Sequence, residues 1–257
     1  MSGTSSRLVS ILRPVVVFLL SVAVACLVWH LLIVGLRIPP YLVPTPTQVF
    51  FTFGEQWRLI LSHVGYTLSA AALGLAVSTT LAVAIATLFS VSANAKDALS
   101  PIVIIFRSIP VTAIAPIMML VLGRGILTSI VVVSIVSFFP LLVNLSRGLL
   151  SSDRNAEELL FIYDASKWQR LKMLRIPAAL PFLFTGLRVA GASAILGAML
   201  SEWITGVRGL GNLILDSSEM RETPLLWAAV LISVFVALLV FWTTSACERR
   251  VLHWRQQ

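Results

Sequence analysis

Long apolar stretches that contain no charged residue most restrict the folds open to this chain. The segment from Val64 to Ala95 contains no Asp, Glu, Lys or Arg, and it exceeds the roughly 20 residues that one helical crossing of a bilayer needs. Of all 257 residues, 58% are hydrophobic and 12% are charged, whereas an ordinary soluble domain has roughly 25% charged residues. This composition excludes a water-soluble enzyme and predicts an all-α polytopic membrane protein.

The apolar segments predict six transmembrane helices. They are residues 14–36, 64–95, 101–122, 126–145, 182–203 and 224–247. A signal peptide is the rival interpretation of the first segment, but no small-residue cleavage site follows its apolar run. Small residues such as Gly74 and Ala82 let membrane helices approach closely, so the second segment is expected to pack centrally. Residues 46–61 predict a helix that lies at the membrane interface.

Positive charges predict how these helices are oriented. With the N-terminus inside, most Lys and Arg fall on the inner side, namely Arg7, Arg13, Lys96, Arg147, Arg154, Lys167, Arg170, Lys172, Arg175, Arg249, Arg250 and Arg255. The outer side receives Arg37, Arg58, Arg124, Arg208 and Arg221. Cytoplasmic loops of membrane proteins retain Lys and Arg. We therefore expect a cytoplasmic N-terminal segment (1–13), one transmembrane domain (14–247) and a cytoplasmic tail (248–257). The net charge of +8 then needs no nucleic-acid partner.

Residues 153–181 form the one long stretch of water-soluble character. Two short amphipathic patterns occur in it, separated by Asp164-Ala165-Ser166. This triplet predicts a break between two short helices, with Ser166 as the N-cap of the second. Pro177 and Pro181 are expected to end that second helix and to start the next hydrophobic one.

The same stretch resembles the cytoplasmic coupling loop of bacterial ABC importer permeases. Their pattern is Glu-Ala-Ala, three residues, Gly, nine residues and Ile-x-Leu-Pro. Here Glu158 takes the Glu position, Asp164 the Gly position, and residues 174–177 (Leu-Arg-Ile-Pro) the final element at the same spacing. Leu159 and Leu160 replace the Ala pair. Asp tolerates the left-handed backbone better than most residues, so the turn is expected to survive the loss of Gly.

Shorter pieces elsewhere are similar to the nitrate, taurine and sulfonate group of these permeases. They are Leu42-Val43-Pro44-Thr45-Pro46, Arg107-Ser108-Ile109-Pro110, Ala115-Pro116, Gly123-x-Gly125, Gly186-Leu187-Arg188, Glu202 and Gly209-Leu210-Gly211. The resemblance implies a type I importer-like permease with six spans and a coupling loop, about residues 147–181, between the fourth and fifth. It also implies a homodimer in the inner or plasma membrane, two ATPase subunits and an extracytoplasmic binding protein. The implied activity is alternating-access import of a small anion or small polar solute.

In that family the coupling loop docks in a groove of the ATPase subunit. The residues expected to do so here are Glu158, Leu159, Leu160, Asp164, Ala165, Trp168, Leu174, Ile176 and Pro177, with Ile162 and Tyr163 as further apolar contacts. Glu158 and the basic residues are expected to fix the orientation of the loop. The sequence has no GxxxxGK[ST] phosphate-binding motif, so no cofactor is expected and ATP would be hydrolysed by the partner. The alternative is an amphipathic loop that rests on anionic lipid.

Several residues within the spans are candidates for the pathway or a gate: Arg107, Pro110, Pro116, Asn144, Arg188 and Glu202. The two arginines could instead extend to the interface with only a structural role. The prolines are expected to kink the third helix, either beside the pathway or for packing alone. Asn144 could bond a neighbouring helix. Glu202 could pair with an external Arg such as Arg208 or help to form a gate.

Other function classes find less support in the sequence. An intramembrane enzyme would need a catalytic set, and His30, His63 and His253 lie too far apart along the predicted topology to build one. Cys26 and Cys247 lie in apolar segments near opposite ends, without metal-binding spacing. An ion channel would not need the spacing of the coupling loop.

Overall fold

The computed structural model describes the backbone of residues 3–253 and the side chains of residues 16–253 except 18, 19, 106 and 107. Every regular element in this range is helical. The elements are α1 (Gly3–Gly35), α2 (Pro46–Glu55), α3 (Trp57–Val91), α4 (Ala93–Ser108), α5 (Val111–Leu122), α6 (Ile126–Leu149), α7 (Arg154–Ile162), α8 (Lys167–Arg170), a π-helical turn (Leu171–Arg175), α9 (Ile176–Thr205), α10 (Leu210–Glu219) and α11 (Thr223–Val251). The prediction of an all-α chain is confirmed.

Four helices of the described part are long and apolar enough to cross a membrane. They are Trp57–Val91, Ile126–Leu149, Lys167–Thr205 and Thr223–Val251. Two of the six predicted spans are not among them, because the apolar part of α1 within the described side chains is only Leu20–Gly35 and residues 101–122 do not form one helix. The interfacial helix predicted over 46–61 also ends early, at Glu55, and α3 begins at Trp57.

The expectation of a single kinked helix over residues 101–122 was wrong. α4 ends at Ser108 and α5 begins at Val111, with Pro110 as its N-cap in the extended conformation (φ −60°, ψ 130°). Proline has no N–H to continue the hydrogen-bond ladder, and it disfavours helical geometry at the residue before it. Pro110 therefore divides the segment into two helices. Pro101 and Pro116 lie inside α4 and α5 without ending them.

Pro177 and Pro181 likewise do not act as expected, because the helix continues through both. α8, the π-helical turn and α9 follow one another without a gap from Lys167 to Thr205. The wider turn directly precedes Pro177, and the N–H of Ile176 donates to the carbonyl of Leu171, five residues back. A proline ring would collide with the carbonyl four residues before it in a regular helix. The π-helical turn changes the register at that point and lets the helix proceed.

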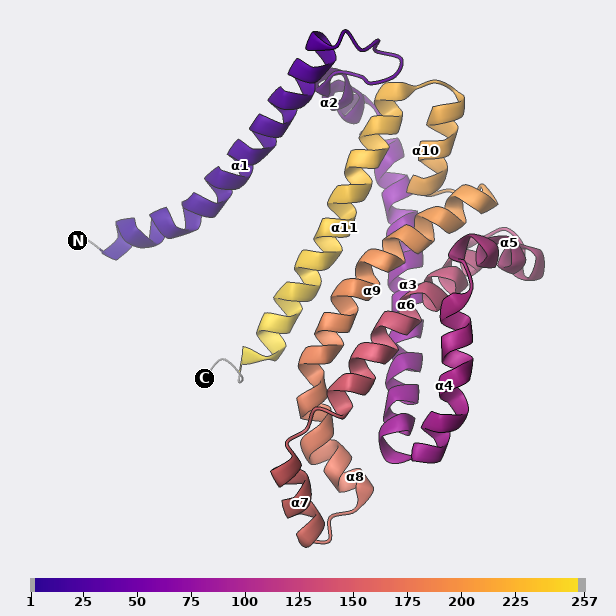
Figure 1. The fold of residues 1–257 in the computed structure, drawn as a ribbon. Helices are drawn as coiled ribbons and strands as arrows, with labels where there is room; N and C mark the ends of the chain where they lie inside the picture. The colour runs from indigo at the N-terminus through magenta and orange to yellow at the C-terminus, as the bar shows by residue number, and fades with distance from the viewer. Residues whose placement is uncertain (1–2, 254–257) are drawn as a thin grey trace.

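α3, α6 and α9 pack together as the centre of the bundle, with α11 beside α9 (Figure 1). The predicted close approach of small residues on α3 is confirmed at Gly74, where an added Cβ would overlap the side chain of Val133 and the carbonyl of Ile130 on α6. Hydroxyl groups on α6 also bond the neighbouring helices. Ser134 donates to the carbonyl of Gly74 (3.1 Å) and Ser137 to the carbonyl of Ala190 (3.3 Å).

The two ends of the bundle are built differently. α7 and α8 project from one end, whereas α2 and α10 lie at the other, and α1 slopes away from the bundle (Figure 1). Thr45 and Gln48 form a capping box at the start of α2, in which each side chain accepts from the other's backbone N–H. The projecting loop and the α10 end are thus separated by the length of α9.

We expect Gly74→Val to destabilise the bundle by about 1–3 kcal/mol, because the new methyl groups would occupy space that Val133 fills. Gly65→Val is the matched control on the same helix, since a Cβ at Gly65 meets no atom within 4 Å. Thermal unfolding of both variants in detergent, followed by size-exclusion chromatography, measures the effect. Equal stability of the two variants would contradict the close contact.

Candidate functional site

The loop between α6 and α9 is shaped by side chains that cap its two short helices. The carboxylate of Asp153 accepts from the N–H of Asn155 at the start of α7 (3.2 Å). Asp164 adopts the left-handed conformation (φ 55°), so the predicted turn without glycine is confirmed. Ser166 caps α8 as predicted, in a capping box with Gln169. Local sequence therefore fixes both the break and the start of the second helix.

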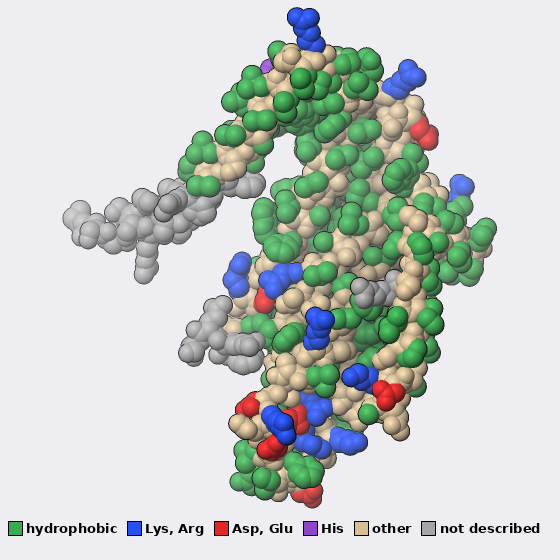
Figure 2. Space-filling view, in the orientation of Figure 1, with side chains coloured by type: hydrophobic (Ala, Val, Ile, Leu, Met, Phe, Trp, Pro, Cys, Tyr) green, Lys and Arg blue, Asp and Glu red, His purple; other side chains and the backbone are tan. Residues whose placement is uncertain are grey.

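The outer face of this loop is apolar and exposed. The exposed large side chains are Leu159 (53%), Phe161 (70%), Ile162 (78%), Tyr163 (77%), Trp168 (67%) and Met173 (65%). Figure 2 shows hydrophobic side chains at the tip of this end of the molecule, beside a group of charged ones. α7 has no buried residue. A contiguous exposed apolar surface of this kind typically marks a site of interaction.

The residues predicted for partner docking divide between the two sides of the loop. Glu158, Leu159, Asp164, Trp168 and Ile176 are exposed. The others face inward in part: Leu160, Ala165, Leu174 and Pro177. Leu160, Leu174 and Pro177 thus lie closer to the bundle than the prediction implied, and Phe161 adds to the outer face that Ile162 and Tyr163 were expected to form.

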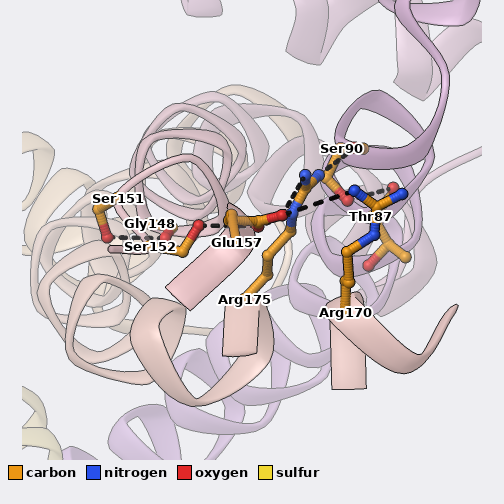
Figure 3. A network of polar contacts seen from close by, with 8 residues as sticks. All are labelled: Thr87, Ser90, Gly148, Ser151, Ser152, Glu157, Arg170 and Arg175. Carbon is orange, nitrogen blue, oxygen red and sulfur yellow. Dashed lines mark hydrogen bonds and ion pairs between the residues drawn. The ribbon is translucent and has the colours of Figure 1, made fainter. Parts of the chain in front are cut away.

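The inner side of the loop is held to the bundle by a group that we call the loop junction: Ser90, Val91, Glu157, Lys167, Arg170 and Arg175. Nε of Arg175 donates to Oε1 of Glu157 (2.6 Å), and its Nη2 donates to Oε2 (3.3 Å). Nη1 of Arg175 donates to the carbonyl of Ser90 at the end of α3. Figure 3 shows Arg175 between Glu157 and Ser90. The ion pair and the helix end thus meet on one guanidinium.

Two further cations complete the loop junction. Nη1 of Arg170 lies 4.0 Å from Oε2 of Glu157, and Nζ of Lys167 donates to the carbonyl of Val91 (3.5 Å). The last carbonyls of a helix have no partner within it and carry partial negative charge. Lys167 and Arg175 therefore satisfy the C-terminus of α3 from a segment about 80 residues further along the chain.

The charge of Glu157 is stabilised by these contacts. The hydrogen bond from Arg175 lowers the pKa of the Glu157 carboxyl below its ordinary value, and a hydrogen bond from Ser152 (3.0 Å) also lowers it, against the opposing effect of burial. Hydrogen bonds to a carboxylate favour its charged form. Glu157 is thus held ionised at neutral pH.

Sequence reasoning assigned the orienting role to Glu158 and missed Glu157. Glu158 points outward and pairs with Arg154, four residues earlier (3.1 Å), with the two side chains 63% and 91% exposed. A signal was present, because Glu157 shares one helical face with Ala156 and Leu160, which are all partly buried. The face that contacts the bundle could have been identified from this spacing.

The pathway candidates within the spans are not brought together into one site. Arg188 pairs with Glu248 of α11 (3.0 Å) and so joins α9 to the last helix. The sequence had suggested a place in the pathway or at the membrane interface for Arg188, and neither suggestion included this ion pair. Nδ2 of Asn144 donates to the carbonyl of Pro140 in its own helix (2.8 Å), and not to a neighbouring helix as expected. The side chain of Arg107 lies outside those that the structure describes.

Glu202 lies in a second polar cluster, at the α10 end of the bundle. Its side chain is fully buried, and Oε2 accepts from Oγ1 of Thr67 (3.0 Å) and from the N–H of Gly211 (2.9 Å). Among the described residues it forms no ion pair, so the proposed pairing with Arg208 is wrong. Its carboxyl group faces the N-terminus of α10, where the first N–H groups have no partner within the helix.

Thr67 and His63 of α3 tie the same helix start to the bundle. The N–H of Leu210 donates to Oγ1 of Thr67 (2.8 Å), and Nδ1 of His63 lies 2.8 Å from the carbonyl oxygen and 3.2 Å from the nitrogen of Gly209. A Cβ at Gly209 would overlap the carboxylate of Glu202. Gly209 of the Gly209-Leu210-Gly211 motif is therefore explained by the space that Glu202 occupies, and Gly211 by the backbone of Met199.

No metal-binding group is found in the described part of the chain. No three His, Cys, Asp or Glu side chains lie together there, and both cysteines are exposed and unpaired. His63 is buried against Gly209, whereas His30 and His253 are exposed. The polar groups described here are suited to holding helices together.

Comparison with known sequences shows similarity to permease proteins of transport systems. The model of the family "binding-protein-dependent transport system inner membrane component" matches residues 78–253. The formylaminopyrimidine transport permease protein ThiX of Halalkalibacterium halodurans is 32% identical over 219 residues, covering 85% of this chain and 88% of that protein. The putative aliphatic sulfonates transport permease protein SsuC of Bacillus subtilis is 29% identical, with 92% and 87% covered.

Comparison with solved structures supports the same fold. A chain from inward-facing conformations of the MetNI methionine ABC transporter superposes with a TM-score of 0.69. It is 18% identical in sequence, and the match covers 77% of this chain and 98% of the other. At this identity the likeness concerns the fold alone.

We expect Glu202→Ala to destabilise the protein by about 1–3 kcal/mol, because the N–H of Gly211 and the hydroxyl of Thr67 lose a buried acceptor. Glu202→Gln keeps an acceptor oxygen at the same position along the side chain and should lose less stability. Thermal unfolding in detergent compares the two variants. A Gln variant as unstable as the Ala variant would contradict the role of the acceptor.

The lowered pKa of Glu157 predicts a pH dependence of stability. Because the folded pKa lies below the ordinary value of 4.5, the stabilisation is complete above about pH 4.5 and is lost as the pH falls through the folded pKa. When the pH is lowered from 6.5 to 4.0, the wild type should therefore lose more thermal stability than Glu157→Gln. The exposed neighbour provides the control, since Glu158→Gln should behave as the wild type. The same pH dependence in all three proteins would contradict the assignment.

Proposed function

Because the chain belongs to the family of binding-protein-dependent transport system inner membrane components, we propose that it forms the translocation pathway of an ATP-driven importer. The chain is a transport subunit of the ABC type, and ATP hydrolysis belongs to separate subunits. This membership sets aside an ion channel or an intramembrane enzyme. We infer that two ATPase subunits, an extracytoplasmic binding protein and a second copy of this chain complete the transporter.

The observation that supports this proposal most directly is the projecting α7–α8 loop. Its outer face exposes apolar side chains and its inner face is bonded to α3 through Glu157 and Arg175. We propose that Leu159, Phe161 and Trp168 contact the ATPase subunit on the cytoplasmic side. Movement of that subunit would then be transmitted to the bundle through the loop junction and through α9, which continues from the loop without a break.

A second copy of the chain would account for the short helices. Neither α4 nor α5 is long enough to count as a span, and Ile117, Leu120 and Val121 of α5 are exposed. We propose that a homodimer covers this apolar surface and encloses one pathway near the Pro110 break. We propose six crossings, the third made by α4 and α5 together, with both termini in the cytoplasm, a transmembrane domain over 14–247 and short ends.

We propose a small anion or small polar solute as the substrate and alternating access as the mechanism. Relatives named for formylaminopyrimidine, aliphatic sulfonates, taurine and nitrate support this substrate class. Closure of the ATPase pair would shift the population between inward-open and outward-open bundles. Arg188 and Glu202 each hold a helix contact in the present arrangement, so we assign them to positioning of α11 and α10.

A charge on the outer face of the loop should prevent docking of the ATPase. Leu159→Asp is expected to lower co-purification of the ATPase subunit of the same transporter by roughly tenfold or more, since buried apolar anchors dominate such interfaces. Met220→Asp is the matched control, because Met220 is also exposed (72%) but lies at the end of α10. Both variants should reach the membrane in equal amounts.

Two outcomes would contradict this proposal. One is unchanged co-purification and ATP-dependent uptake with Leu159→Asp. The other is ATP hydrolysis by the purified chain without any partner. The binding protein of the same system, once its ligand is measured, would then identify the transported solute.

A further inference from the structure

A small polar cavity lies beside the loop junction, between the end of α3 and the start of the helix that continues into α9. It has a volume of about 250 Å³ and is lined by Ser90, Val91, Lys167, Arg170 and Arg175. One water needs only about 10–15 Å³ of such volume. The cavity therefore has room for a group much larger than a water molecule.

The charges around this cavity favour an anion. Three cations line it, namely Lys167, Arg170 and Arg175. Among the described residues, the only carboxylate that forms an ion pair with any of them is that of Glu157. Nε of Arg170 is buried and has no hydrogen-bond partner among the described atoms. Lys167 has three N–H donors, of which one makes a long bond to Val91. Lys167 therefore has donors available for an incoming oxygen.

The lengths of the helices beside the cavity point to the source of that anion. α3 has 35 residues and is about 52 Å long, which exceeds the 40–45 Å of a bilayer with its headgroups. The helix that starts at Lys167 has 39 residues and is longer still. Both helices are therefore long enough for Ser90 and Lys167, at their ends, to reach the level of the lipid phosphates.

We propose that this cavity binds the phosphate group of an anionic membrane phospholipid. Lys167 and Arg170 would donate to the phosphate oxygens, while Arg175 keeps its contacts with Glu157 and Ser90. Basic pockets between membrane helices are suited to such headgroups. A bound phosphate would neutralise the excess positive charge next to the end of α3 and tighten the loop against the bundle.

Native mass spectrometry of the purified full chain tests this proposal. The delipidated protein is incubated with phosphatidylglycerol or with phosphatidylcholine of the same acyl chains. The wild type should retain phosphatidylglycerol in preference to phosphatidylcholine. Lys167→Gln should weaken this retention about fivefold, the effect of removing one cation near a lipid headgroup.

Lys172→Gln is the matched control, because Lys172 is exposed in the same helical segment and does not line the cavity. It should retain the lipid within about twofold of the wild type. Equal loss in both variants, or equal retention of the two lipids by the wild type, would overturn the proposal. Displacement of the lipid by millimolar inorganic phosphate would assign the cavity to a free anion and would overturn the lipid as its ligand. Neither ATPase nor transported solute takes part, so failure here would leave the proposed function intact.

Discussion

The guanidinium of Arg175 is the contact on which the arrangement of this end of the molecule depends. It bonds the carboxylate of Glu157 on α7 and the carbonyl of Ser90 on α3, and it belongs to the helical turn that leads into α9. Residues from α3, α7 and the turn before α9, up to 85 positions apart in the sequence, are therefore held at one point. Arginine suits this position because its planar donors can serve a carboxylate and a carbonyl at the same time.

α9 connects this point to the second polar cluster at the far end of the bundle. The helix runs from the loop to Glu202, whose carboxylate receives the start of α10 and the hydroxyl of Thr67. Both clusters also include residues of α3, at its two ends. A displacement of the loop would thus act on two helices that are fixed to each other near each end and packed on α6 between them. Such a frame favours movement of the bundle as a unit over bending of single helices.

Much of the fold followed from composition and from short-range patterns in the sequence. The helical class, the cap at Ser166 and the left-handed turn at Asp164 depend on local chemistry and were predicted. The division at Pro110 and the continuation through Pro177 were not, because a proline can either end a helix or be accommodated by a wider turn, and neighbouring helices decide which occurs. Arg170 and Thr67 were missed for a similar reason, because their roles depend on partners 13 and 143 residues away along the chain. Glu157 was missed although its spacing with Ala156 and Leu160 marked the face of α7 that contacts the bundle.

The contact between Glu202 and Gly209 restricts the order in which this protein can change over generations. A side chain at position 209 would overlap the carboxylate, and the φ of 157° at Gly209 also disfavours a side chain, so Gly209 is replaced more easily after Glu202 has become smaller. Glu202 can be replaced first, because a smaller residue at position 202 leaves room beside Gly209 and removes only the hydrogen bonds that Glu202 makes. Lineages that have lost the glycine should therefore descend from ancestors that had already lost the acid.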